Sequence, residues 1–138
     1  MSDRGTREVR FINPPELEKP AGYSHVVEVR ANRLIFLAGQ AALDADGKLV
    51  GGADLEAQAE RAVRNLSVAL ASAGCTAANL VKLTVFLRDM GKLADYRRAR
   101  DRFLKSVEPH AAPAITLVEV SRLFAEGLLI EIEGIAAA

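Results

Sequence analysis

The sequence predicts a single α+β domain in which two helices lie on one face of a mixed β-sheet. Two segments repeat apolar residues at helical spacing, and several short segments are β-branched or alternate with period two. They follow one another in the order strands, helix, strand, helix, strands. Because 138 residues suit one domain and no repeat or linker interrupts them, we expect residues 1–138 to form one unit.

The N-terminal part is expected to begin irregularly and to continue into two strands. Residues 1–10 or so are polar, and we expect them to be flexible. The proline-rich segment Phe11–Tyr23 is expected to be an irregular lead-in. Residues Val26–Val29 and Leu34–Ala38 are rich in β-branched and apolar side chains, which predicts two short strands joined by a turn at residues 31–33.

The segment Asp54–Ala73 is the clearest helix in the sequence. Asp54 can accept hydrogen bonds from the first free amides, and Gly74 can take the left-handed conformation that ends a helix. The apolar residues form one stripe at helical spacing: Leu55, Ala59, Ala62, Val63, Leu66, Ala69, Leu70 and Ala73. We expect this stripe to pack on the sheet.

The C-terminal half is predicted to contain the remaining elements. Residues Leu80–Asp89 alternate with period two, which is typical of a strand. Residues Leu93–Val107 carry apolar side chains on one side, which predicts the second helix. Two more strands, Ala114–Val120 and Leu128–Ile135, follow a proline-containing loop.

Two helices can cover only one face of such a sheet. The segments RLIFLAGQ and GLLIEIEGIA nevertheless carry apolar residues in both strand phases, so the second face is also apolar. A second copy of the chain would cover it, which predicts a homo-oligomer. The alternative is a monomer that closes its N-terminal segment over the sheet.

The charge balance argues against a nucleic-acid partner. The formal net charge is zero, whereas affinity for nucleic acids rests on clustered positive charge. The basic stretch Tyr96–Arg100 is short, and it is interpreted as a solvated helix face, with a ligand-facing charge as the alternative. We therefore expect no nucleic-acid partner.

The cysteine and the histidines give no sign of a disulfide or a metal site. Cys75 is the single cysteine, and His25 and His110 lie far apart without metal-ligand spacing. The first residues lack the apolar core of a signal peptide, and no apolar run approaches membrane-spanning length. We expect a cytoplasmic protein with neither a metal nor a membrane partner.

Three carboxylates interrupt apolar strand segments. Glu131 and Glu133 alternate with isoleucines in the last strand, and Glu119 lies near the end of the strand before it. A carboxylate in such a setting needs a partner or water, because desolvating it alone is costly. Either these glutamates pair with Lys82 or Arg88, or one of them faces a pocket and takes a proton.

Six sequence blocks together resemble the Rid (reactive intermediate deaminase, YjgF-like) family. The blocks are GYSHVVEV, LIFLAGQ, AQAERAVRNLSVALASAGC, NLVKLTVFLRDM, PAITLVEVSRL and IEIEGIA, and they span about residues 22–136. The resemblance implies a chorismate-mutase-like α+β fold that assembles as a homotrimer with ligand clefts between subunits. It also implies hydrolysis of enamines and imines to carbonyl products and ammonia, without metal or cofactor.

The resemblance carries individual site residues as well. Tyr23 matches the tyrosine of the family's cleft, Gly39 its glycine, and Glu131 its catalytic glutamate. Ile115 stands where the family has the arginine of a PAR motif, and Ala38 replaces a serine before Gly39. An arginine grips a substrate carboxylate with two charge-assisted hydrogen bonds, and isoleucine offers none.

The loss of this arginine leaves the function open between two classes. Losing one partner of a buried charged pair costs about 2–5 kcal/mol, which predicts weak or altered deaminase activity. Arg97, from the second predicted helix, could supply another substrate-binding cation. The alternative is a non-catalytic trimer that binds or senses a ligand, and an endoribonuclease is the least favoured function.

Overall fold

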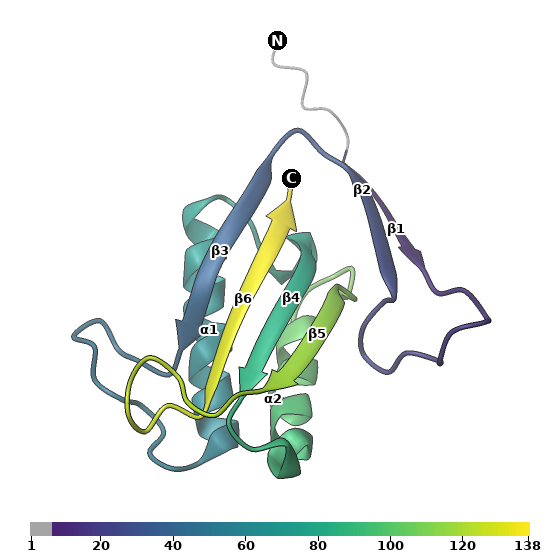
Figure 1. Ribbon diagram of the computed structural model, residues 1–138. Helices are drawn as coiled ribbons and strands as arrows, with labels where there is room; N and C mark the ends of the chain where they lie inside the picture. The colour runs from purple at the N-terminus through teal and green to yellow at the C-terminus, as the bar shows by residue number, and fades with distance from the viewer. Residues whose placement is uncertain (1–6) are drawn as a thin grey trace.

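The computed structural model describes residues 7–138, which form two helices, a four-stranded sheet and a two-stranded ribbon (Figure 1). In chain order the strands and helices are β1 (Glu8–Ile12), β2 (Val26–Arg30), β3 (Leu34–Ala41), α1 (Leu55–Ser72), β4 (Leu80–Leu87), α2 (Leu93–Lys105), β5 (Ala114–Glu119) and β6 (Ile130–Ala137). Short 3₁₀ helices precede β4 (Ala77–Asn79) and α2 (Met90–Lys92). The predicted α+β class is confirmed.

The large sheet is mixed. Its strand order is β3-β6-β4-β5; β4 and β5 run parallel, whereas β6 is antiparallel to both of its neighbours. The C-terminal strand therefore lies inside the sheet, and β5 forms one edge (Figure 1). The β1–β2 ribbon is a separate antiparallel pair beside this edge strand.

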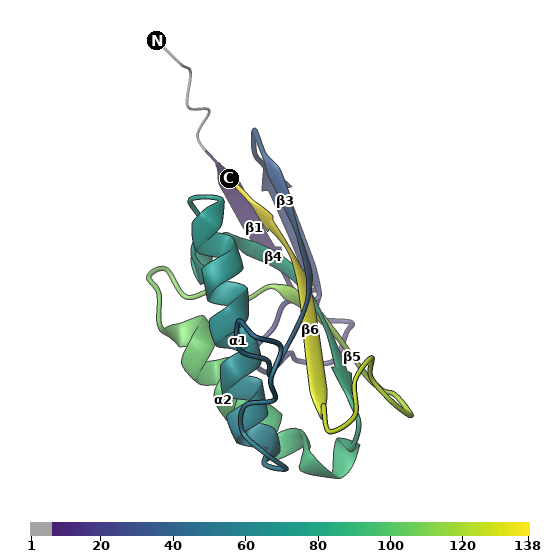
Figure 2. The same cartoon turned by 90° about the vertical axis from the view of Figure 1, so that its left-hand side faces the viewer.

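Both helices pack on the same face of the large sheet (Figure 2). Leu66 and Leu70 of α1 are buried against the sheet, together with Val85 of β4 and Ile132 of β6. Each side chain of this kind contributes about 1.5–3 kcal/mol when it is fully buried. The hydrophobic core is thus a single layer between the helices and one side of the sheet.

The signals at the two ends of α1 act as the sequence predicts. The side chain of Asp54 accepts a hydrogen bond from the Ala57 amide at 3.2 Å, which satisfies one of the free amides of the first turn. Gly74 has φ +73°, a conformation that a side chain would disfavour, and it ends the helix. The Cys75 side chain that follows is buried and unpaired among residues 7–138.

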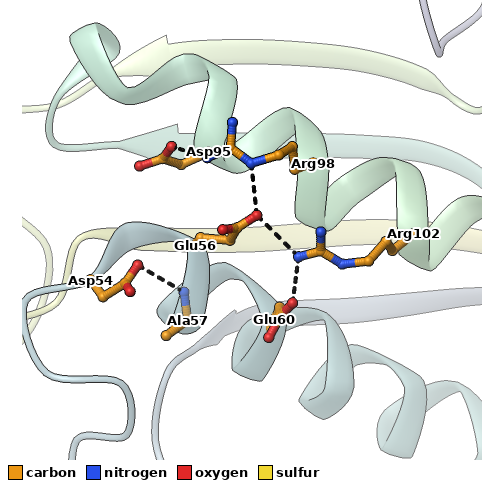
Figure 3. A network of polar contacts seen from close by, with 7 residues as sticks. All are labelled: Asp54, Glu56, Ala57, Glu60, Asp95, Arg98 and Arg102. Carbon is orange, nitrogen blue, oxygen red and sulfur yellow. Dashed lines mark hydrogen bonds and ion pairs between the residues drawn. The ribbon is translucent and has the colours of Figure 1, made fainter.

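An ion-pair network ties α2 to α1 on the outer side of the helices (Figure 3). Arg98 and Arg102 both donate to the Glu56 carboxylate, at 2.9 and 3.2 Å. Arg98 also pairs with Asp95, and Arg102 with Glu60. These side chains are exposed or half-buried, so solvent screens the pairs, and their main effect is to hold Arg98 and Arg102 toward α1.

The N-terminal region differs from the sequence expectation. Residues 8–10, expected to be flexible, belong to β1, while residues 1–6 lie outside the described part of the chain. The expected turn does join β2 to β3, but β2 pairs with β1 rather than with β3. The five residues of β1 are too few and too polar to reveal a strand, which forms through cross-strand pairing such as the 3.2 Å ion pair of Arg10 with Glu28.

Gln58 of α1 is a buried polar side chain that fixes the loops at one end of the sheet. Its amide nitrogen donates to the carbonyls of Gly52 at 2.7 Å and Gly127 at 2.9 Å. Its amide oxygen accepts from the Leu129 amide at 2.9 Å. One side chain therefore joins α1 to the loop before it and to the loop before β6.

We expect Gln58→Leu to lower the free energy of unfolding by about 3 kcal/mol, because it leaves several buried backbone groups unpaired. Urea denaturation measures this change. As a control, Ser67→Leu places the same side chain at an exposed position of α1 and should change stability by about 0.5 kcal/mol or less. A loss at Gln58 no larger than in the control would contradict this role.

Candidate functional site

The face of the sheet opposite the helices is uncovered in the single chain. We call it the open face; its side chains are those of Phe36, Ala38, Lys82, Thr84, Phe86, Thr116, Val118, Glu131, Glu133 and Ile135. Phe36 is 73% exposed and Val118 38% exposed, values that suit a contact surface better than a free one. A depression of about 440 Å³ lies between Phe36 and Glu133 on this face.

Glu131 and Gly39 meet on the open face. Glu131 pairs in register with Ala41, and the irregularity of β3 between Leu37 and Gln40 places Gly39 beside it. A Cβ atom on Gly39 would overlap Glu131 Oε1 and would lie 2.8 Å from its Cδ. Only glycine leaves room for the carboxylate in this position.

Burial raises the pKa of Glu131 above that of an ordinary glutamate, and the nearby charge of Glu133 raises it further. A carboxyl group whose pKa lies nearer to neutral is better suited to exchanging protons at physiological pH. Glu131 is therefore a candidate acid–base group.

A second cavity of about 290 Å³ lies on the other side of β5, between this edge strand and α2. We call it the edge pocket; it is lined by Glu18, Lys19, Ala21, Tyr23, Tyr96, Arg97, Arg100, Ile115 and Leu117. Ile115 pairs in register with buried Leu83, so its side chain points to the helix side. The amide of Ser24 donates to the Pro113 carbonyl at 3.1 Å, which holds the preceding tyrosine beside the start of β5.

The predicted site residues thus form two groups in one chain. Tyr23, Arg97 and Ile115 line the edge pocket. Gly39 and Glu131 lie on the open face, and two steps in the strand order separate β6 from β5. A single chain does not bring the five residues into one cavity.

Arg100 also lines the edge pocket, and the sequence analysis did not single it out. The stretch Tyr96–Arg100 was interpreted as a solvated helix face, yet Arg100 is only 7% exposed. Its guanidinium pairs with Asp101 at 2.9 Å and donates to the Ala21 carbonyl at 3.3 Å. Helical spacing would have predicted the burial of Arg100, because residue 100 lies four positions after the buried Tyr96 and therefore on the same side of α2.

The expected pairing of strand glutamates with Lys82 or Arg88 is wrong. Glu119 accepts a hydrogen bond from the Met90 amide at 2.9 Å, at the start of the 3₁₀ helix before α2. Lys82 donates to the Thr116 hydroxyl at 2.7 Å. Within residues 7–138, neither Glu119 nor Glu133 forms an ion pair with these cations.

The same part of the chain shows no cluster of three or more histidine, cysteine, aspartate or glutamate side chains able to hold a metal ion. Nor do the described residues include a helix long and apolar enough to cross a membrane. The candidate functional groups are the Glu131 carboxylate on the open face and the arginines and tyrosines of the edge pocket.

Comparison with known proteins identifies the family. The family model for endoribonuclease L-PSP matches residues 15–138. The chain belongs to this family, which is also the Rid family. A crystal structure of a Rid family protein from Yersinia pestis has a TM-score of 0.85 at 35% identity, covering 94% of this chain and 98% of that one. RidA from a Psychrobacter species gives 0.67 at 29% identity, covering 88% and 92%.

Curated relatives are similar over most of their length. Protein DfrA of Myxococcus xanthus is 38% identical over 129 residues, which is 92% of this chain and 94% of that protein. A mouse protein named 2-iminobutanoate/2-iminopropanoate deaminase is 36% identical over 115 residues, covering 83% of this chain and 79% of its own length. The resemblance inferred from the sequence blocks is confirmed at the level of the family.

Gly39→Ala should displace the Glu131 carboxylate, because the added methyl group takes its place. The displaced carboxyl becomes better hydrated, so its pKa should fall toward the ordinary value of a glutamate. A pH titration followed by NMR of labelled glutamate measures this shift. Gly47→Ala is the control, since no atom lies within 4 Å of its added Cβ. An unchanged Glu131 pKa in Gly39→Ala would contradict the packing described.

Proposed function

We propose that this chain is a Rid-type homotrimer whose intersubunit clefts bind a small molecule and hydrolyse enamine or imine intermediates to a carbonyl product and ammonia. Its activity is weak or altered relative to an enzyme with arginine at position 115. The observation that carries the proposal is the split of the site residues between the open face and the edge pocket. In this proposal, the open face of one chain supplies the acid–base group, and the edge pocket of a neighbouring chain supplies the residues that bind the ligand.

The open face supports assembly into a trimer. Phe36 and Val118 are exposed there, and a neighbouring copy that covers them removes apolar surface from water. Gly39 and Glu131 belong to the surface that becomes covered. When a neighbour contributes its edge pocket at this contact, its Tyr23 and Ile115 face the Glu131 carboxylate, and the two halves form one cleft.

The proposed chemistry needs only water and a proton carrier. The carbon of a C=N bond is electrophilic, and water adds to it while Glu131 takes one of the water protons. Returning this proton to nitrogen completes the carbinolamine. Glu131 then takes the hydroxyl proton and passes it to the amino nitrogen, so that the C–N bond breaks, ammonia leaves and the C=O bond forms. Glu131 ends in its starting state, and the raised pKa suits both transfers. Holding the imine against an oriented water supplies the remaining acceleration.

Ile115 supports the altered specificity. The edge pocket has an apolar wall at this position, so a substrate carboxylate finds no fork of donors there. The mouse relative is named for imines of small keto acids, which carry such a carboxylate. The present chain is proposed to perform the same class of reaction with a different balance of substrates.

A non-catalytic ligand-binding trimer is the second candidate, favoured by Ile115 and by the alanine that precedes Gly39. It would retain the cleft without turnover. Ribonuclease activity, which the description of the family includes, is less favoured because the formal net charge is zero. Ligand-induced shifts in melting temperature without product release would identify the binding protein.

The deciding experiment generates imines in the presence of the protein. Amino acids with an oxidase supply carboxylate-bearing imines, and an aldehyde with ammonia supplies a neutral one. We expect faster release of carbonyl product and ammonia with at least one of them. No acceleration with any imine would contradict the enzymatic proposal and favour the binding protein.

Glu131→Gln should reduce this turnover by about 100-fold or more, because glutamine cannot accept a proton from water. Glu133→Gln is the matched control on the same strand and face, and it should keep most of the activity. It also removes a charge that raises the Glu131 pKa, so the acidic limb of the rate profile should move to lower pH. Equal losses in both variants would contradict the role of Glu131.

A further inference from the structure

The edge pocket has positive character despite the neutral chain. Lys19, Arg97 and Arg100 line it, whereas Glu18 is the one carboxylate among its lining residues. Arg98, the intervening basic residue of α2, is held in the ion-pair network toward α1 (Figure 3). Of the four arginines of α2, Arg97 and Arg100 line the cavity, whereas Arg98 and Arg102 are held toward α1.

The guanidinium of Arg100 is held by hydrogen bonds, but some of its N–H groups have no hydrogen-bond partner among residues 7–138. Nε donates to Asp101 at 3.0 Å, and Nη2 donates to the Ala21 carbonyl at 3.3 Å. A Cβ atom on Gly22 would lie 2.9 Å from the guanidinium carbon, so the loop before β2 packs directly on this group. The two N–H groups on Nη1 form no hydrogen bond with residues 7–138. A rigid guanidinium with free donors therefore borders the cavity.

Tyr96, which also lines the cavity, carries a buried hydroxyl without a hydrogen-bond partner among the described residues. Its side chain is 1% exposed, and its hydroxyl oxygen has no hydrogen-bond partner among the described residues. Burial raises the pKa of Tyr96 to about 12, so the hydroxyl keeps its proton and remains a donor. Arg100 lies over the Tyr96 ring with its guanidinium carbon 5.7 Å from the centroid. A buried donor without an acceptor is costly, and an anionic oxygen would satisfy it.

We propose that the edge pocket is an anion site in which Arg100 and Tyr96 bind the carboxylate of a small substrate, with Arg97 at its rim. This inference rests on the proposed function and names its substrate class. The apolar side chain of Ile115 then forms a wall of the pocket, and the charge comes from α2 instead of from β5. The sequence analysis offered Arg97 as a candidate to replace the missing arginine; in this proposal the buried Arg100 makes the main contact with the carboxylate.

A purely structural Arg100 would make the same contacts with Asp101 and the Ala21 carbonyl. The two roles differ in what they predict for ligands. A structural arginine affects charged and neutral ligands equally, through the shape of the loop. An anion-binding arginine affects only the ligand that carries the carboxylate.

Pyruvate and its neutral amide, pyruvamide, are the probes that separate these roles. Isothermal titration should show tighter binding of pyruvate to the wild-type protein. Arg100→Met should raise the pyruvate Kd by about 10- to 100-fold and leave that of pyruvamide nearly unchanged. Arg98→Met is the matched control, because it removes the same charge from the exposed side of the helix and should leave both constants unchanged.

Tyr96→Phe keeps the inference testable if Arg100→Met does not fold. The tyrosine hydroxyl has no partner to lose among residues 7–138, so the variant should fold normally. It should raise the pyruvate Kd by about 3- to 10-fold, again without affecting pyruvamide. Equal binding of the two probes by the wild type, or an unchanged pyruvate Kd in the variants that fold, would overturn the anion site.

These outcomes are distinct from those that test the proposed function. A protein that hydrolyses neutral imines but binds no pyruvate would contradict the anion site alone. A protein that binds pyruvate through Arg100 but releases no product from any imine would contradict the deaminase and retain the anion site.

Discussion

Two helices can bury only one face of a four-stranded sheet, so the other face of this sheet is left uncovered in the single chain. On the helix side, Leu66, Val85 and Ile132 make a closed core. On the other side, Phe36 remains 73% exposed and the Glu131 carboxylate sits among apolar neighbours. Apolar surface of this kind favours association, and a carboxylate within it acquires a raised pKa. The same constraint that leaves one face of the sheet uncovered therefore also leaves a carboxyl group with a raised pKa on that face.

The periodic elements of the fold could be read from the sequence, because their signals are local. The stripe and cap of α1 and the alternation of β4 specify their structures within one segment. By contrast, β1 forms only because β2 is available to pair with it, and no local pattern records that partner. The pairing of β2 away from β3 escaped prediction for the same reason, since a connecting turn does not specify which strands exchange hydrogen bonds.

The candidate site was predictable in part. The family resemblance found Tyr23, Gly39 and Glu131, and the close contact between the last two gives a physical reason for glycine at position 39. The resemblance could not show that Tyr23 lies at the edge pocket whereas Gly39 and Glu131 lie on the open face. That separation depends on the strand order and on which side chains each face of the sheet presents. Arg100 was missed because a run of arginines suggested solvent, although helical spacing places one of them beside Tyr96.

The central claim is that copies of this chain cover the open face and join the two halves of the site. Sedimentation equilibrium at micromolar concentration tests it most directly, since it measures mass without assuming a substrate. The account predicts a particle of three chains of 14.8 kDa each. A single species with the mass of one chain would contradict it.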